Sequence, residues 1–127
     1  MIHTTSQPGD YPTDFSNGQI RAVADAPLEK GGMGAGFGPH ELLEAALATC
    51  INMAVRMSAN KLGIVLEGAA TSVRLDRSQP DVVKYEYTLE LVGSLTDKER
   101  QQLEEAANAC PVRQTLSKRA NFIAAFR

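Results

Sequence analysis

Two cysteines, Cys50 and Cys110, are the residues of this 127-residue chain best suited to redox chemistry. Cys110 directly precedes Pro111. A proline disfavours helical geometry in the residue before it and suits the first position of a helix. The sequence therefore predicts Cys110 at or near the N-cap of a helix over residues 111–119. Because unpaired amides at that end favour a thiolate, we expect a lowered pKa for Cys110. Arg113, one turn later, either adds positive charge or is a solvated surface arginine.

Cys50 lies in an apolar segment, where no neighbour along the chain can activate it. The residues one helical turn away carry no base and no charge; they are Ala46, Leu47, Met53 and Ala54. Apolar burial alone would raise the pKa of a thiol and leave it inert. Cys50 is therefore either a core thiol or a nucleophile activated by a cation from another segment or another chain.

Other chemistries have weaker signals. His3 and His40 would complete a set of four zinc ligands with the cysteines, but no C-x-x-C or H-x-x-x-H spacing exists, so we expect no metal site. The G-x-S-x-G elbow of serine hydrolases is absent. Residues 28–39 contain G-x-G-x-G without the rest of a dinucleotide fingerprint, which predicts a mobile loop beside a site and no bound cofactor. Two structural cysteines in a binding or interaction domain remain the alternative.

Length and charge limit the class of protein. With 43% apolar residues, the chain fits one domain over residues 1–127. The 13 basic and 15 acidic side chains form no block of one sign, so we expect no nucleic-acid partner and no membrane-surface partner. The first residues lack the pattern of a secretory signal, which predicts a cytoplasmic protein. Cytoplasmic cysteines are more often catalytic or metal-binding than disulfide-bonded.

A long apolar helix is predicted to carry Cys50. The segment from Glu41 to Leu62 suits about six turns, and Gly63 follows its end. Between Glu44 and Arg56 there is no charged residue, and a helix that is apolar all round is a buried one. The uncharged stretch is too short to span a membrane. We therefore expect a second copy of the chain to cover part of this helix, the alternative being its own sheet.

The remaining elements predict an α+β fold. Asn17 and Gly18 favour a hairpin turn, and apolar residues alternate with polar ones over residues 83–91, in the second of two strands that turn near residues 79–81. Thr96 and Glu99 have the spacing of a capping box at the start of a second helix. Residues 121–127 are predicted to close the chain as a short strand.

Two stretches, "GPHELLEAALATC" ending at Cys50 and "CPVRQTLS" beginning at Cys110, resemble the OsmC/Ohr family. Characterised members of that family are thiol-dependent organic hydroperoxide reductases. The order of helices and strands agrees with the family from about residue 21 to residue 127. The resemblance implies an OsmC-like fold and an intertwined homodimer. In that dimer two central long helices are wrapped by antiparallel sheets, and both chains build each active site.

The resemblance also implies a role for each thiol. Cys50 is similar to the peroxidatic cysteine, which attacks a small organic hydroperoxide, and Cys110 to the resolving cysteine, which then forms a disulfide with it. An external dithiol, of the lipoyl type in the best known branch, would reduce that disulfide in oxidative stress defence. The alternative on the same fold is a ligand-binding or interaction protein without peroxidase activity.

One position departs from the family pattern. The hydroperoxide reductases carry a glutamate directly after the proline, and it pairs with an arginine at the reactive thiol. Here His40 occupies that position, and a neutral imidazole cannot balance the charge of an arginine. Glu41 is the candidate for the missing carboxylate, with Glu44 a weaker one; the alternative for each is an exposed surface side chain. Arg21 is the only arginine in the strands before the long helix, so it is assigned as the activating cation.

Overall fold

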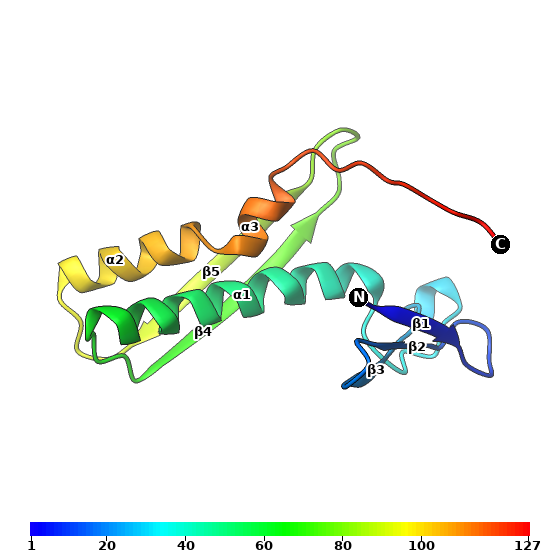
Figure 1. The fold of residues 1–127 in the computed structure, drawn as a ribbon, viewed down its shortest axis with the longest axis horizontal. Helices are drawn as coiled ribbons and strands as arrows, with labels where there is room; N and C mark the ends of the chain where they lie inside the picture. Colours follow the sequence, from blue (N-terminus) through cyan, green and yellow to red (C-terminus); the bar gives the residue numbers. More distant parts are fainter. The chain divides into compact units, whose positions relative to one another are not determined.

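A computed structural model describes all 127 residues, which divide into two compact units at residues 1–45 and 46–127 (Figure 1). The first unit contains three short strands: β1 (His3–Ser6), β2 (Thr13–Ser16) and β3 (Arg21–Ala24). They form one antiparallel sheet in the order β1-β2-β3, and a single turn of 3-10 helix, η1 (Leu28–Lys30), follows. The arrangement of residues 1–127 as a single domain stays a prediction.

The predicted hairpin turn at Asn17 and Gly18 is confirmed. Gly18 has a φ of +97°, which favours glycine. The Asn17 Oδ1 accepts hydrogen bonds from the backbone N–H groups of Gln19 at 2.9 Å and Ile20 at 2.8 Å. The Asn17 side chain thus satisfies backbone N–H groups of the turn in place of a backbone carbonyl. The turn fixes the register of β2 and β3, in which Ser16 lies opposite Arg21.

The glycine-rich segment, predicted to be a mobile loop, is bonded to a buried carboxylate. Asp25 is 3% exposed, and its oxygens accept hydrogen bonds from the backbone N–H groups of Ala26 at 2.8 Å, Met33 at 3.0 Å and Ala35 at 3.0 Å. The amide of Ala35 contributes most to lowering the pKa of Asp25; burial opposes it, and the Met33 and Ala26 amides add to the lowering. The loop is therefore tied at its centre by one side chain.

A long helix, α1 (Pro39–Leu62), begins in the first unit and continues through the second. It starts two residues earlier than predicted and ends at Leu62, and the left-handed φ of +68° at Gly63 fits the predicted stop. The second unit continues with β4 (Gly68–Asp76), β5 (Lys84–Val92), α2 (Asp97–Asn108) and α3 (Pro111–Leu116).

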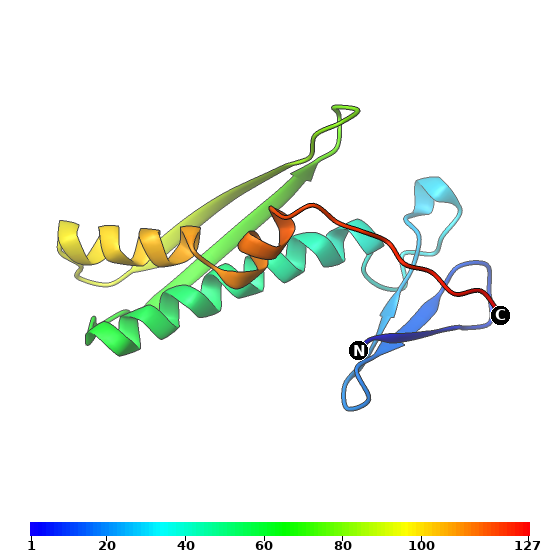
Figure 2. The same cartoon turned by 45° about the horizontal axis from the view of Figure 1, so that its top comes forward.

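In the second unit, helices α1 and α2 lie along one face of the antiparallel β4–β5 hairpin (Figures 1 and 2). Side chains along β5 alternate between exposed and half-buried, as the period of two predicts. The half-buried ones pack against the core: Tyr85, Tyr87, Leu89 and Leu91. The α+β fold with a long central helix and antiparallel sheets is confirmed.

The core of the second unit follows a single stripe of α1. Its buried residues recur every four positions, which places them on one face of the helix: Leu47, Ile51, Val55 and Ala59. Leu103 and Ala107 of α2 and the thiol of Cys110 complete this cluster together with Ile64. The capping box that begins α2 is confirmed, because Thr96 and Glu99 exchange hydrogen bonds of 3.1 and 3.2 Å.

The opposite face of α1 is exposed, so the prediction of a helix buried all round holds for one side only. Met53 is 48% exposed and Met57 is 67% exposed. The reason is geometric: a two-stranded sheet and α2 cover one side of a helix. By length and composition alone α1 could also cross a membrane, a test that core helices of soluble proteins pass as well.

The predicted strand at residues 121–127 is wrong for the single chain, and α3 ends at Leu116 instead of residue 119. Residues 119–127 have no regular structure, and their large apolar side chains are almost fully exposed, at 96% for Phe122, 97% for Ile123 and 96% for Phe126. No strand of the chain receives the backbone hydrogen bonds of this segment.

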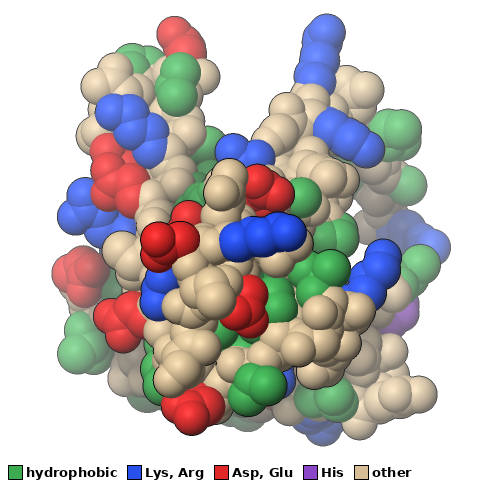
Figure 3. Space-filling view, turned by 90° about the vertical axis from the view of Figure 1, so that its left-hand side faces the viewer, with side chains coloured by type: hydrophobic (Ala, Val, Ile, Leu, Met, Phe, Trp, Pro, Cys, Tyr) green, Lys and Arg blue, Asp and Glu red, His purple; other side chains and the backbone are tan.

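Basic and acidic side chains are interleaved on the face drawn in Figure 3.

Candidate functional site: a pair of thiols

The two cysteines come from different elements of the second unit. Cys50 is half-buried in α1, beside the buried residues Leu47 and Ile51. Cys110 is the N-cap of α3, with φ −62° and ψ 142°, the extended geometry that a residue before proline prefers. It is 1% exposed, and both thiols are free. The predicted N-cap position of Cys110 is confirmed.

The fold brings the two thiols close together. The Cys50 side chain lies near enough to Cys110 to raise the pKa of that thiol, and Cys50 packs against the core cluster to which Cys110 belongs. Their positions in the sequence differ by 60 residues (110 − 50), so no local signal sets this contact. Thiols that pack in one cluster can form a disulfide with little movement of the backbone.

The predicted lowering of the Cys110 pKa is wrong. Burial raises the pKa of this thiol, and the neighbouring Cys50 raises it further. The backbone amides of Arg113 and Val112 act in the opposite direction without reversing the shift. Helix α3 has only six residues, and its first amides do not offset the loss of water around the sulfur. Cys110 therefore remains a neutral thiol at pH 7.

The chain around Cys110 is held by bonds that the sequence did not reveal. The backbone N–H of Arg113 donates to the Cys110 Sγ at 3.4 Å, while the Arg113 guanidinium donates to the Asn108 carbonyl at 3.0 Å. The Gln114 side-chain amide donates to the Ala109 carbonyl at 3.2 Å. The Tyr87 hydroxyl donates to the side-chain oxygen of Asn108. Helical spacing after Cys110 could have indicated Arg113 and Gln114, but nothing local indicates Tyr87.

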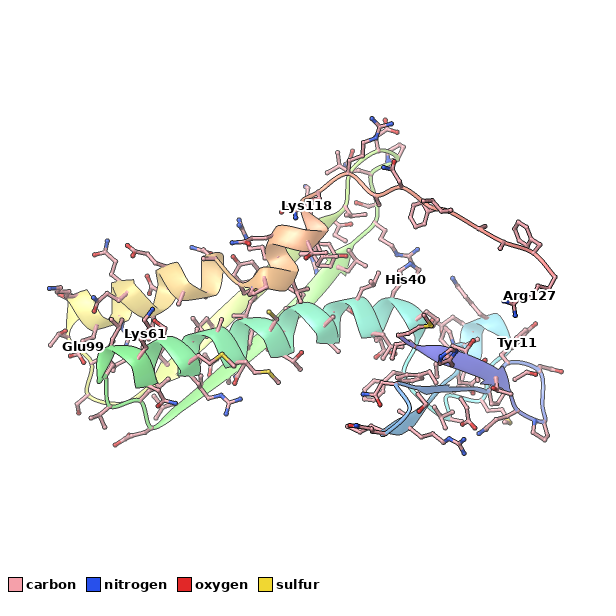
Figure 4. All side chains as sticks on the ribbon, viewed as in Figure 1. Tyr11, His40, Lys61, Glu99, Lys118 and Arg127 are labelled. Atoms are coloured by element: carbon pink, nitrogen blue, oxygen red, sulfur yellow. The ribbon has the colours of Figure 1, made fainter.

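Arg21 and Glu41 lie in the first unit, whereas both thiols lie in the second. Arg21 is the exposed first residue of β3. Glu41 is in the first turn of α1, and its Oε1 accepts a hydrogen bond from the Gly38 backbone N–H at 2.8 Å. That bond satisfies an amide at the start of the helix. His40, labelled in Figure 4, precedes Glu41 in the same turn. The activating roles of Arg21 and Glu41 stay predictions.

A hollow of about 200 Å³ lies where α1 faces β4. Its lining comprises Ala48, Thr49, Asn52, Met53, Arg56 and Thr71. The Asn52 side-chain amide donates to the Ala69 carbonyl at 2.9 Å, and the Thr71 hydroxyl is buried without a hydrogen-bond partner. No group of three His, Cys, Asp or Glu side chains is arranged to hold a metal ion.

Comparison with known proteins points to one family. The sequence profile described as OsmC-like protein matches residues 31–124, while no curated protein sequence matches the chain. A Psychrobacter arcticus protein, provisionally described as an osmotic stress induced and detoxification response protein, is 25% identical. Its structure superposes with a TM-score of 0.77 over 90% of this chain and 85% of its own.

Two further solved structures share the fold. An OsmC-like protein from Mycoplasma pneumoniae is 19% identical, with a TM-score of 0.77 over 91% of this chain and 85% of its own. The organic hydroperoxide resistance protein OhrB of Bacillus subtilis is 22% identical, with a TM-score of 0.62 over 92% of this chain and 90% of its own. The profile match covers well over half of the sequence. The chain belongs to the OsmC-like family.

Proposed function

We propose that this protein is a thiol peroxidase that reduces organic hydroperoxides, with Cys50 as the peroxidatic and Cys110 as the resolving cysteine. The observation that supports it best is the packing of the two free thiols in one apolar cluster. The OsmC-like family includes organic hydroperoxide resistance proteins, which supports the same class of reaction.

The reaction has three steps. The Cys50 thiolate attacks one peroxide oxygen, an S–O bond forms, the O–O bond breaks, and the alkoxide leaves as an alcohol after taking a proton. The sulfur of Cys110 then attacks the Cys50 sulfenic acid, which forms the disulfide and releases water. An external dithiol finally reduces the disulfide by thiol exchange and becomes oxidised itself.

The second step also needs a proton. A sulfenic acid must lose its oxygen as water, so the departing hydroxide needs a proton. Because burial keeps Cys110 protonated, its own S–H supplies that proton as the S–S bond forms. The apolar residues that surround both sulfurs favour organic hydroperoxides over hydrogen peroxide.

Arg21 and Glu41 complete the proposed site as the cation that activates Cys50 and its balancing carboxylate. We expect Arg21→Met to slow Cys50 oxidation. Arg21→Lys should restore part of the rate, because it keeps the positive charge. A matching loss in Glu41→Gln would support the pairing, although that variant also alters the helix start at Gly38.

The proposal includes a homodimer in the cytoplasm, since OsmC-like proteins are typically dimeric. Two features of the single chain support a second copy as cover: the exposed apolar side of α1, with Met53 and Met57, and the exposed apolar tail, with Phe122 and Phe126. Burying such surfaces between copies would be favourable. Sedimentation measurements on the purified chain test this part of the proposal.

Peroxide consumption with dihydrolipoamide as reductant tests the activity. Wild type should consume cumene hydroperoxide faster than hydrogen peroxide, and Cys50→Ser should abolish turnover. Cys110→Ser should still react once with the peroxide and then stall as a sulfenic acid that dimedone traps. Turnover that persists in Cys50→Ser would refute the assignment of the nucleophile.

A ligand-binding protein without peroxidase activity is the second candidate, and the hollow between α1 and β4 favours it. Its buried Thr71 hydroxyl lacks a partner, and the Arg56 and Asn52 side chains line the same space. In that case Cys50→Ser and Cys110→Ser should leave ligand binding unchanged, and both thiols should react slowly with hydroperoxides.

A further inference from the structure

The corner between α2 and α3 is closed by side chains that follow Cys110 and bond backbone carbonyls that precede it. The last carbonyls of a helix have no partner within it. Here Arg113 bonds the Asn108 carbonyl and Gln114 bonds the Ala109 carbonyl, at 3.0 and 3.2 Å. Both donors belong to α3 and reach back over Cys110 to the end of α2. The corner is therefore fixed by the residues that follow the thiol.

A third bond ties this corner to the sheet. The Tyr87 hydroxyl of β5 donates to the Asn108 side chain, so the corner is anchored to an element that also packs against the core. Pro111 has no N–H and limits the backbone on the other side of Cys110. The cysteine thus has little freedom to swing its sulfur away from α1.

We infer that Arg113 is a positioning residue for Cys110: its guanidinium, bonded to the Asn108 carbonyl, and its backbone amide, bonded to the Cys110 sulfur, hold that sulfur against Cys50. Gln114 assists through the Ala109 carbonyl. The inference rests on the proposed function and concerns its second step. The Arg113 guanidinium donates to a carbonyl of the corner, so its charge is directed away from the role of thiolate partner.

The step it governs is the closure of the disulfide. The Cys110 sulfur forms a bond to the Cys50 sulfur, the S–O bond of the sulfenic acid breaks, and the oxygen leaves as water with the Cys110 proton. The rate depends on how often the two sulfurs are aligned, because both groups belong to one chain. A looser corner should slow this step and leave the attack of Cys50 on the peroxide unchanged.

The test measures how oxidised Cys50 partitions between disulfide and trapped sulfenic acid. One equivalent of cumene hydroperoxide is added with dimedone present, and mass spectrometry quantifies both products. Because a typical exposed hydrogen bond contributes about 1 kcal/mol, Arg113→Met should lower the ratio of disulfide to dimedone adduct about fivefold to tenfold. The rate of Cys50 oxidation should stay at the wild-type value.

Matched variants separate positioning from general damage. Arg113→Lys keeps a donor and should recover part of the ratio, whereas Arg119→Met, an exposed arginine after α3, should match wild type. Gln114→Ala should lower the ratio of disulfide to dimedone adduct by a smaller factor. If Arg113→Met fails to fold, this variant alone tests whether the corner positions Cys110. A ratio equal to wild type in both Arg113→Met and Gln114→Ala would overturn the inference.

An equilibrium measurement keeps the inference testable even if the protein is not a peroxidase. Glutathione disulfide oxidises the two thiols and is itself reduced to two molecules of glutathione, so titration gives the effective concentration of Cys110 toward Cys50. Arg113→Met should lower this value about fivefold to tenfold on the same reasoning. An unchanged value would refute the positioning role, whereas a wild type that forms no sulfenic acid refutes only the peroxidase.

Discussion

Oxidising Cys50 and Cys110 to a disulfide should stabilise the folded chain strongly, because the two thiols already pack in one cluster of the reduced protein. A cross-link between groups that are already in contact adds little strain to the native state. Its main effect is then on the unfolded chain, which loses the freedom of the loop that the bond closes.

The magnitude follows from the length of that loop. The cysteines are 60 positions apart (110 − 50). The loop-entropy relation gives about 14 cal/mol/K for such a loop, or about 4 kcal/mol at 25 °C. With an unfolding entropy of about 2.1 cal/mol/K per residue, this corresponds to a rise in Tm of about 15 °C for a chain of this size.

Thermal and urea unfolding of diamide-oxidised and reduced protein, at one protein concentration, would measure the gain. Cys50→Ser and Cys110→Ser provide the controls, since neither variant can close the loop. Each should show the same Tm with and without diamide. Nonreducing mass analysis must show the bond within one chain.

A gain below about 1 kcal/mol would refute the reasoning, because it would mean that the folded state strains to bring the sulfurs together. Disulfides formed only between chains would refute it as well. Either result would contradict the contact of Cys50 and Cys110 on which the proposed function depends.

Four further outcomes are expected. Leu103→Ala removes a side chain with no exposure and should lower the free energy of unfolding in urea by about 2–5 kcal/mol, whereas the half-exposed Leu62→Ala should cost much less. Thr96→Ala removes the cap of α2 and should cost about 1 kcal/mol in the same assay, with Thr96→Ser close to wild type. The folded state raises the pKa of Cys110, so the contribution of this thiol to stability is full below the unfolded thiol pKa of about 8.5 and is lost as the pH rises through the folded pKa. Between pH 8 and 11 the free energy of unfolding in urea should therefore fall more steeply in wild type than in Cys110→Ala. The folded state lowers the pKa of Asp25, so the contribution of this carboxylate to stability is present above about pH 3.9 and is lost in acid. At neutral pH, Asp25→Asn should speed amide hydrogen exchange in the glycine-rich loop, and unchanged exchange would contradict the role of the carboxylate.

Local patterns in the sequence determined most of the elements. The turn at Gly18, the alternation along β5, the stop of α1 at Gly63 and the capping box at Thr96 depend on neighbours within a few residues. Such signals are readable because the interactions that they report span at most one turn or one strand pair. The N-cap position of Cys110 belongs to this group, since Pro111 alone sets its backbone.

The prediction for residues 121–127 failed because a strand needs a partner. The run of apolar residues there is compatible with a strand, but no other strand of the single chain receives its hydrogen bonds. The prediction that α1 is buried all round also depends on a partner that the single chain does not supply. Sequence indicated that it should be covered, and a single copy covers one face only.

Tertiary structure alone decided the state of the candidate site. The contact of Cys50 with Cys110 and the bond from Tyr87 to Asn108 join segments far apart in the chain, so no spacing rule predicts them. The pKa of Cys110 depends on two opposing effects, helix amides and loss of water, and sequence shows only the first. Burial is a property of the packed core, and in this protein it outweighs the amides of a six-residue helix.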